Sequence, residues 1–391
     1  MTEWKEYKLG EITIEGKGSY GIAAPAVDFD INKYTYLRIT DINDDGTINK
    51  NSLKSVDDIN ASNYLLKPND IVFARTGASV GRSYFYDGKD GALVYAGFLI
   101  KFSLNPDKVN PKILKYYTHS QSYYDWIVSV DNGATRGNIN AQTYASMPII
   151  LPERKRQDEI VSILSSLDDK IDLLHRENKT LEAMAETLFR QWFIEEAKED
   201  WEEKPLSFYG KIVCGKTPPK KESKYFGGET PFIKIPDMHN KTFVINSEDS
   251  LTKEGVLYQK EKILPPFSII VSCIATVGLV VLNAKEAQTN QQINSIIPYE
   301  EEYRYFLYLH LMNMYDDLNA MASGGTATLN LNTSNFSKIK IAYPTDDVLC
   351  AFNKQVSLLF DKIYNNQQQI QTLIQQRDSL LPKLMSGEVK I

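Results

Sequence analysis

One eight-residue segment of the chain has the residue types and spacing of a phosphate-binding loop. Residues 210–217 (Gly-Lys-Ile-Val-Cys-Gly-Lys-Thr) match the pattern G-x-x-x-x-G-K-[ST] letter for letter. Such a loop must open a helix whose N-terminus faces the phosphates, but here Pro218 and Pro219 follow at once. We therefore expect a coincidental match. Nucleotide hydrolysis is kept only as an alternative that ATP binding by the isolated chain would support.

The other patterns with catalytic potential fail on their chemistry. Residues 264–267 (Leu-Pro-Pro-Phe) are similar to the Pro-Pro-aromatic site of amino-methyltransferases, but Leu264 stands where a polar residue should hold the target amine. No Ser-His-Asp or paired-carboxylate arrangement is evident. The histidines are dispersed and have no ligand spacing; they are His119, His175, His239 and His310. We expect no catalytic residue, no metal and no cofactor.

Polar loops flanked by glycine are better candidates for a functional surface. Arginine, asparagine and glutamine side chains pair with the edges of guanine or adenine, and lysine meets phosphate. The competing interpretation is that these loops are only turns. The candidate DNA-binding residues are Arg75, Thr76, Ser79, Arg82, Thr135, Arg136 and Asn138 in the first half of the chain, and Lys216, Thr217, Lys220, Lys221, Asn290, Gln291, Thr326, Thr328 and Asn330 in the second.

These loops lie in two similar globular segments, which the sequence predicts to be α+β. Each segment has a short apolar strand behind proline, at residues 70–74 and 267–272, that leads into a matching turn. Each also has helical stretches, at 113–127 and 303–320. The polar loop near the end of each segment is followed by a strand that closes on proline, at 147–152 and 339–344.

A long heptad helix follows each globular segment, about 192 residues apart in the chain. An apolar stripe with 3.5-residue periodicity over five heptads is typical of a coiled coil. Each helix would be on the order of 60 Å long. The first stripe is Ile160, Leu164, Leu167, Ile171, Leu174, Asn178, Leu181, Ala185, Leu188 and Trp192; the second is Phe352, Val356, Leu359, Ile363, Asn366, Ile370, Leu373, Arg377, Leu380 and Leu384.

The asparagines in the two stripes indicate how the helices pair. In an antiparallel pair with full overlap, facing residue numbers sum to 544, so Asn178 meets Asn366. A parallel register would place both amides against apolar residues, at a cost of roughly 1–3 kcal/mol each. We therefore predict an antiparallel coiled coil with approximate two-fold symmetry, and globular segments at its opposite ends. Two-fold symmetry suits a split DNA site read at two places.

Composition limits the class of protein without deciding its function. The net charge is −6, but residues 1–152 and 200–345 carry only about −1 each. Strong non-specific DNA affinity is therefore not expected without a partner, because phosphate neutralisation supplies most of it. No apolar run is long enough to span a membrane. The three cysteines are far apart and form no C-x-x-C pair, so we expect a cytoplasmic protein without disulfides.

Several segments make the family recognisable. Residues 375–389 (Gln-Gln-Arg-Asp-Ser-Leu-Leu-Pro-Lys-Leu-Met-Ser-Gly-Glu-Val) resemble the C-terminal helix ending of the DNA-specificity subunit of type I restriction-modification systems. The first helix, from 152–157 through 188–193, is similar to the central conserved region of that family. Residues 215–218 with 225–228 are similar to the opening of a target-recognition domain; in the first segment, Gly16-Lys17-Gly18-Ser19 stands in place of that opening.

The resemblance implies a non-catalytic subunit that reads a bipartite DNA site. It implies target-recognition domains at 1–152 and 200–345, a central helix at 153–199 and a C-terminal helix at 346–391. Expected partners are double-stranded DNA, two methyltransferase subunits and restriction motor-nuclease subunits. Two alternatives stay open: a coiled-coil scaffold with two protein-binding heads, and the specificity chain of a bifunctional methyltransferase-nuclease.

Overall fold

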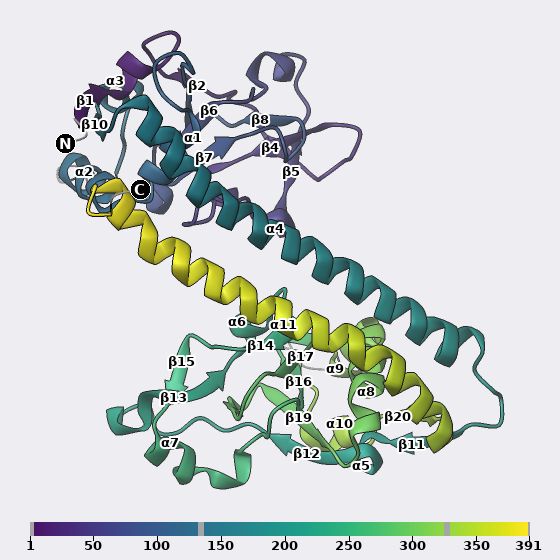
Figure 1. The fold of residues 1–391 in the computed structure, drawn as a ribbon. Helices are drawn as coiled ribbons and strands as arrows, with labels where there is room; N and C mark the ends of the chain where they lie inside the picture. Colours follow the sequence, from purple (N-terminus) through teal and green to yellow (C-terminus); the bar gives the residue numbers. More distant parts are fainter. Residues whose placement is uncertain (1–3, 132–136, 324–328, 390–391) are drawn as a thin grey trace. The chain divides into compact units, whose positions relative to one another are not determined.

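The computed structural model describes residues 4–131, 137–323 and 329–389, which form two compact units. Unit 1 consists of Met1–Lys170 with Leu373–Ile391, and unit 2 consists of Ile171–Thr372. The two long helices, α4 (Arg154–Arg190) and α11 (Asp346–Met385), each contribute one part to each unit (Figure 1). Each unit therefore combines a globular region with a segment of helix pair.

Unit 1 is built from short strands and three short helices in addition to its parts of α4 and α11. Its strands are β1 (Lys5–Lys8), β2 (Ser19–Tyr20), β3 (Ala26–Val27), β4 (Tyr34–Leu37), β5 (Lys54–Val56), β6 (Asp70–Ala74), β7 (Ser83–Tyr86), β8 (Leu93–Tyr95), β9 (Leu99–Ser103) and β10 (Pro148–Leu151). Its short helices are α1 (Lys112–Tyr117), α2 (Gln121–Asp131) and α3 (Ala141–Ala145).

Two four-stranded sheets organise unit 1. One is antiparallel with the order β2-β9-β6-β7, and the other has the order β3-β5-β4-β8 with β4 and β8 parallel. Buried aromatic rings cover the first sheet, and Phe73 of β6 stacks on Tyr144 of α3 at 4.7 Å between centroids. Strand β1 pairs with β10, so the chain enters the globular region beside the strand that leads into α4.

Unit 2 repeats this organisation with longer strands. Its strands are β11 (Glu202–Pro205), β12 (Gly210–Cys214), β13 (Phe226–Ile233), β14 (Phe243–Val244), β15 (Asp249–Leu251), β16 (Ile269–Ile274), β17 (Thr276–Asn283), β18 (Gln288–Thr289), β19 (Ile293–Pro298) and β20 (Lys340–Tyr343). Its short helices are α5 (Leu206–Tyr209), α6 (Ile235–Met238), α7 (Lys253–Tyr258), α8 (Glu301–Asn313), α9 (Tyr315–Ala322) and α10 (Thr333–Ser337).

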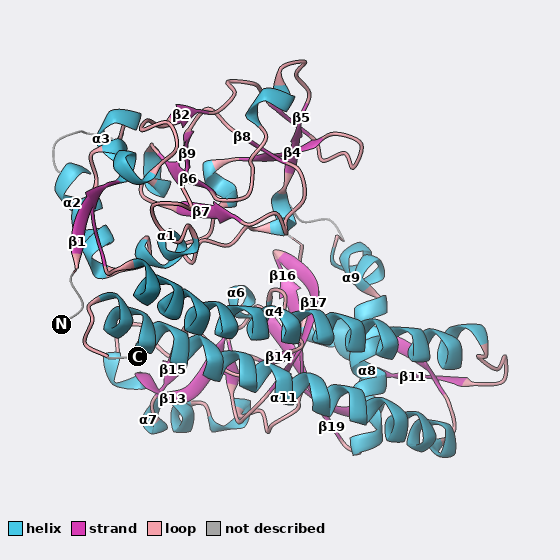
Figure 2. Cartoon of the chain, turned by 45° about the horizontal axis from the view of Figure 1, so that its top comes forward, coloured by secondary structure: helices cyan, strands magenta, loops and turns pink. Residues whose placement is uncertain are grey.

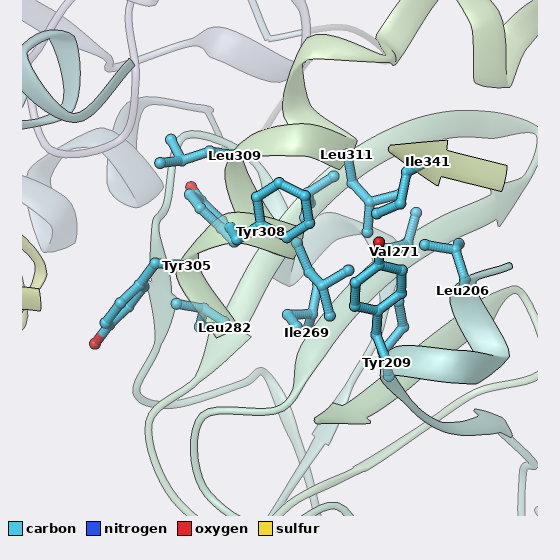
Figure 3. Packing of buried hydrophobic residues seen from close by; sticks show 14 of the residues in the cluster. Leu206, Tyr209, Ile269, Val271, Leu282, Tyr305, Tyr308, Leu309, Leu311 and Ile341 are labelled. Carbon is cyan, nitrogen blue, oxygen red and sulfur yellow. The ribbon is translucent and has the colours of Figure 1, made fainter. Parts of the chain in front are cut away.

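The core of unit 2 lies between its main sheet, α8 and the long helices. The sheet order is β12-β19-β16-β17-β14, a second sheet has the order β15-β13-β18, and β11 pairs with β20. Helix α8 is apolar on most of its surface because it is buried, and Tyr305, Tyr308 and Leu311 pack in the core (Figure 3). Tyr305 also stacks on Phe360 of α11 at 4.2 Å, so α11 contacts the globular region through a residue beside its apolar stripe.

The long helices carry a buried polar pair in unit 2. Asn366 Nδ2 donates to Asn178 Oδ1 at 2.9 Å and also to Glu177 Oε2 at 2.9 Å, and both asparagines are buried. This is the pair expected from the antiparallel register. The prediction of an α+β chain with two sheet regions and two long helices packed together is confirmed (Figure 2).

In unit 1, a charged cluster lies at the contact between the two long helices. Arg377, a polar residue in the second stripe, donates to Asp168 Oδ1 at 3.1 Å, and Lys115 of α1 lies 2.6 Å from Asp168 Oδ2. Burial raises the pKa of Asp168, but Lys115 and Arg377 outweigh it and hold that pKa below its usual value. The arginine that interrupts the apolar stripe is thus explained by its carboxylate partner.

We expect Asp168→Ala to destabilise the chain by about 1–3 kcal/mol, because at a half-buried site it leaves Lys115 without its carboxylate partner and Arg377 with only the exposed carboxylate of Asp378. Chemical unfolding followed by circular dichroism measures the change. The matched control is Asp169→Ala, since Asp169 is exposed and lies 3.0 Å from Lys89; its effect should stay below about 0.5 kcal/mol. Equal effects of the two variants would contradict a special role for Asp168.

The ends of the helices follow sequence signals. Helix α11 ends at Met385, and Gly387 has a φ of 77°, which is the left-handed conformation that glycine favours after a helix. The Trp4 ring lies against Gly387, since a Cβ there would be 3.0 Å from Trp4 Nε1. Among the described residues, no helix is both long and apolar enough to cross a membrane.

Candidate nucleic-acid interface

In each globular region, a glycine directly follows the first strand of the main sheet, Gly21 after β2 and Gly215 after β12. The N–H of Gly21 donates to Leu99 O at 3.2 Å, and the N–H of Gly215 donates to Ile293 O at 3.0 Å. A Cβ would lie 2.3 Å from Ala96 O at the first position and 2.0 Å from Asn290 O at the second. Only glycine fits such a close approach of two backbone segments, so Gly21 and Gly215 occupy equivalent positions.

This equivalence corrects the alignment of the two openings. The sequence suggested that Gly16-Lys17-Gly18-Ser19 replaces the Gly-Lys-Thr-Pro opening of the second region, and that interpretation is wrong. The backbone contacts place Gly21-Ile22 opposite Gly215-Lys216, since Ile22 N–H donates to Tyr95 O and Lys216 N–H donates to Thr289 O. A proline follows within four residues in both cases, at Pro25 and Pro218.

A second set of backbone contacts aligns the polar loops. Ile139 N–H donates to Arg75 O at 2.9 Å, and Leu331 N–H donates to Cys273 O at 2.8 Å. The preceding residues, Asn138 and Asn330, form equivalent bridges with Thr76 and Ile274. Two residues on, Asn140 and Asn332 each cap a short helix. The loops from distant parts of each half therefore meet at one end of the strands of each main sheet.

A third contact adds a turn to the same edge. Arg75 N–H donates to Phe98 O at 3.1 Å in unit 1, and Cys273 N–H donates to Gln292 O at 2.8 Å in unit 2. We call the resulting surfaces edge 1 (Tyr20, Arg75, Phe98 and Asn138) and edge 2 (Thr217, Gln291, Gln292 and Asn330). Edge 1 draws on four segments of the chain and edge 2 on three, and the two surfaces are the best candidates for a site that contacts a ligand.

In edge 1, Arg75 is held by weak contacts. Its guanidinium carbon lies 4.9 Å from the centroid of the Tyr20 ring, and its Nε and Nη2 donate to Asn138 Oδ1 at 3.4 and 3.3 Å. The Tyr20 hydroxyl accepts from Ala141 N–H at 3.1 Å, which fixes the ring. These bonds are long for N–H···O contacts, so the guanidinium can exchange them for a ligand at low cost.

Of the other candidate DNA-binding residues of unit 1, those that the structure describes do not join edge 1. Arg82 is bound inside the unit, because its Nε donates to Asp44 Oδ1 at 2.6 Å and its Nη1 donates to Ile42 O at 3.1 Å. Ser79 is buried, and Thr76 is half-buried within its backbone bridge. Thr135 and Arg136 lie outside the described residues. Arg75 and Asn138 are therefore the candidates of unit 1 that the structure brings together at a surface.

A small cavity of about 170 Å³ lies behind the Arg82–Asp44 pair. His119 lines it, and its Nδ1 is 2.8 Å from Lys115 O. Burial lowers the pKa of His119, so its imidazole is neutral at physiological pH. The cationic side chain that lines this cavity is thus an arginine that already has a carboxylate partner.

In edge 2, Thr217 and Gln291 are linked directly. The Thr217 hydroxyl donates to Gln291 Oε1 at 2.7 Å, and Gln291 is exposed. Asn290 is buried instead, and its Oδ1 accepts from Gln292 N–H at 3.1 Å, which stabilises the turn. Asn330 is exposed beside Ile274. Thr326 and Thr328 lie outside the described residues.

Lysines and tyrosines surround the loop that follows β12. Lys216, Lys220 and Lys221 are exposed. Lys216 Nζ lies 5.4 Å from the centroid of the Tyr258 ring, and that ring is 4.9 Å from the ring of Tyr225. This arrangement of cations beside aromatic faces suits contact with phosphate and sugar.

The segment that matched a phosphate-binding loop has another structure. Residues Gly210–Cys214 form strand β12, and no helix begins in the segment that follows it up to residue 222. The N–H groups of Gly215 and Lys216 are bound to Ile293 O and Thr289 O. They are therefore not available to bind phosphate, and the nucleotide-hydrolysis alternative is rejected on geometry.

Several surface residues of this site carried no clear sequence signal. Tyr20, Phe98 and Tyr258 were not among the candidate residues, and Tyr225 was noted only as part of the segment 225–228. Their exposure alone would not have singled them out, since exposed aromatic residues occur elsewhere in the chain. The signal that was available is the glycine shared by the two openings. Among the described residues, no group of three possible metal ligands is present.

Comparison with known proteins agrees with these features. The model of the type I restriction modification DNA specificity domain matches residues 1–183 and 198–379. The chain is 33% identical to the type I restriction enzyme HindI specificity subunit of Haemophilus influenzae over 100% of both chains. It is 26% identical to the MjaIX specificity subunit of Methanocaldococcus jannaschii, with 73% of this chain and 70% of that protein covered.

A solved structure shows the same fold. The crystal structure of a type I restriction-modification S subunit from M. genitalium matches with a TM-score of 0.58 and 16% identity, and covers 98% of this chain and 96% of that one. The two family matches leave residues 184–197 between them, at the end of α4. The chain therefore belongs to the type I restriction-modification DNA specificity family, and it is a specificity subunit, the non-catalytic component that recognises the DNA target.

Proposed function

We propose that this subunit recognises a bipartite double-stranded DNA site, with residues 1–152 reading one half-site and residues 200–345 reading the other. The observation that carries the proposal is the equivalent set of backbone contacts in the two globular regions, which brings together the loops at Arg75, Phe98 and Asn138 in one region and those at Cys273, Gln292 and Asn330 in the other. The helical segments 153–199 and 346–391 are proposed to set the gap, and the buried Asn178–Asn366 pair to fix their register.

We further propose that the subunit works in the cytoplasm as part of a larger complex. Two methyltransferase subunits would complete the grip on DNA, since each globular region is close to neutral. Restriction motor-nuclease subunits would join for cleavage. Within each half, Arg75, Asn138, Gln291 and Asn330 are the proposed base-reading residues, and Lys216, Lys220 and Lys221 the proposed phosphate contacts.

Selection from a random double-stranded DNA library, with the methyltransferase subunits present, tests this proposal. We expect the wild-type complex to select two short conserved blocks separated by a fixed spacer. Gln291→Ala should relax the preference within one block by about tenfold to a hundredfold and leave the other block unchanged. The matched control is Arg176→Ala, on an exposed part of α4, which should change neither block.

Selection of a single block, or of none, would contradict the bipartite proposal. A loss of preference in both blocks with Gln291→Ala would contradict the assignment of one half-site to each globular region. Lysine variants separate the two kinds of contact: Lys220→Ala with Lys221→Ala should weaken binding to every sequence alike and reduce its salt dependence.

A further inference from the structure

Edge 1 places an arginine next to two exposed aromatic residues. Arg75 lies over the ring of Tyr20, and its N–H donates to the carbonyl of Phe98. Phe98 occupies the turn between β8 and β9, which is closed by Leu99 N–H donating to Ala96 O at 2.8 Å. The side chains of Phe98 and Tyr20 are 59% and 43% exposed. More than half of Phe98 is therefore exposed on a fixed turn, where its ring is accessible to a ligand.

The equivalent positions of unit 2 carry different chemistry. Cys273 replaces Arg75 and is 1% exposed, Gln292 replaces Phe98, and the strand position of Tyr20, just before the shared glycine, is Cys214. The common framework therefore presents an arginine and an aromatic ring on edge 1, but amide and hydroxyl groups on edge 2. The two edges must contact DNA by different means.

We infer that edge 1 reads a guanine through Arg75 and stacks Phe98 against a neighbouring base step, and that edge 2 does neither. This inference rests on the proposed function and adds the identity of a base and a local deformation of the DNA. It makes the two half-sites unlike: one contains a guanine beside a step that this subunit unstacks, and the other contains no such step.

The geometry around Arg75 favours guanine. A guanidinium presents two parallel N–H groups that match O6 and N7 of guanine, which is the commonest specific contact in the major groove. Arg75 is partnered by the neutral amide oxygen of Asn138, whereas Arg82 in the same unit is 2.6 Å from the Asp44 carboxylate. A neutral partner at 3.3 Å leaves the full positive charge for the base. The Tyr20 ring supports the guanidinium plane from one side.

The geometry around Phe98 favours stacking on a base step. Its backbone is fixed on one side by Arg75 N–H and on the other by the 96–99 turn. A base stacked on an aromatic ring contributes to binding, and pyrimidine–purine steps unstack easily enough to accept such a ring. Because the Arg75 backbone binds the Phe98 backbone, a guanine on Arg75 and a step at Phe98 would be close neighbours in the sequence of the half-site.

The test uses the complex with its methyltransferase subunits and its selected DNA site. We expect Arg75→Ala to lose guanine preference at one position of one block by about tenfold to a hundredfold. Arg75→Lys should lose most of that preference while it keeps the charge, since a lysine cannot pair bidentately. Phe98→Ala should weaken binding by about tenfold or more without changing the preferred bases.

Fluorescence of 2-aminopurine reports the stacking directly. Placed at successive positions of each half-site other than the methylated bases, the probe should brighten on binding at one step of the half-site read by unit 1. Phe98→Ala should abolish that signal. Phe29→Ala is the matched control, a phenylalanine of unit 1 that is 54% exposed and is not part of edge 1, and it should leave the signal intact, as should Gln292→Ala in unit 2.

The outcomes separate this inference from the proposed function. If the wild-type complex selects two blocks but Arg75→Ala keeps the guanine, or Phe98→Ala keeps the fluorescence, the inference is wrong and the bipartite proposal stands. If the wild-type complex selects no two-block site, the proposed function itself fails. A bright probe in both half-sites that Phe98→Ala leaves unchanged would assign the unstacking to the methyltransferase and overturn the role of Phe98.

Discussion

Lowering the pH from 6.5 to 4 is expected to cost unit 2 about 3 kcal/mol of stability through a single histidine. The ring of His310 packs against Phe189 and Phe306, and its Nδ1 is buried without a hydrogen-bond partner among the described residues. Burial lowers the pKa of His310 to about 4. In the unfolded chain, a histidine has a pKa of about 6.5.

The direction of the pH effect follows from the number of protons that His310 binds in the native and unfolded states. Between pH 6.5 and 4, the unfolded chain binds a proton at His310 and the native chain does not, so acidification favours unfolding. The free energy of unfolding should therefore fall by about 1.4 kcal/mol per pH unit across this window and level off below it. Above pH 6.5 the contribution is complete and constant.

Urea unfolding of the full chain at a series of pH values measures this slope. His310→Leu should remove most of the pH dependence between 6.5 and 4, while carboxylates continue to act at the lower end. His239, which is exposed in the same unit, supplies the control, and His239→Leu should keep the wild-type slope. An unchanged slope in His310→Leu would show that the imidazole is not the group responsible.

The second large effect is expected at the buried asparagine pair. Asn366→Leu removes the donor that both Asn178 Oδ1 and Glu177 Oε2 share, so we expect a loss of about 1–3 kcal/mol. Asn178→Leu should cost less, because Asn366 keeps Glu177 as a partner. In the double variant, two leucines face each other, and most of the stability should return.

The double variant should lose specificity of pairing while it regains stability. A buried asparagine pair restricts helix register and partner choice in coiled coils, so we expect the double variant to form mixed oligomers that size-exclusion chromatography with light scattering detects. Asn365→Leu, an exposed neighbour on α11, is the control and should change neither property. A monodisperse double variant would show that the asparagine pair contributes to stability and does not determine how the helices pair.

Crosslinking tests the register itself. In a chain whose three cysteines are replaced, Asn178→Cys with Asn366→Cys should oxidise readily, whereas Asn178→Cys with Leu359→Cys, one heptad away, should not. Equal yields from both pairs would mean that the helices slide past each other in solution.

The parts of the fold that follow from local sequence patterns were predictable. The apolar stripes, their polar interruptions and the proline-bounded strands lead directly to α4, α11, β10 and β20, because periodicity and turn residues act over short distances. The antiparallel sense followed from two asparagines, since a buried amide needs a partner. Helix α11 begins at Asp346 and ends at Met385, within the predicted bounds.

The surface of the candidate site was only partly predictable. Arg75 and Asn138 were identified by type, but their meeting depends on pairing between strands and loops about 60 residues apart. Ser79 and Asn290 matched the same composition and are buried, because a polar residue in a tight turn can bond the backbone as well as face solvent. Tyr20 and Phe98 were missed since their role depends on a neighbour distant in sequence.

Because unit 1 is formed by two separate segments of the chain, its folding depends on the order in which those segments are synthesised. Unit 2 is a continuous stretch, Ile171–Thr372, inserted between the two segments of unit 1. Trp4 packs on Gly387, and Arg156 donates to Val389 O, so unit 1 closes only with residues near 389. On the ribosome, the domain that starts second can finish first. The core of unit 1 therefore stays incomplete until Leu381 and Leu384 have been synthesised.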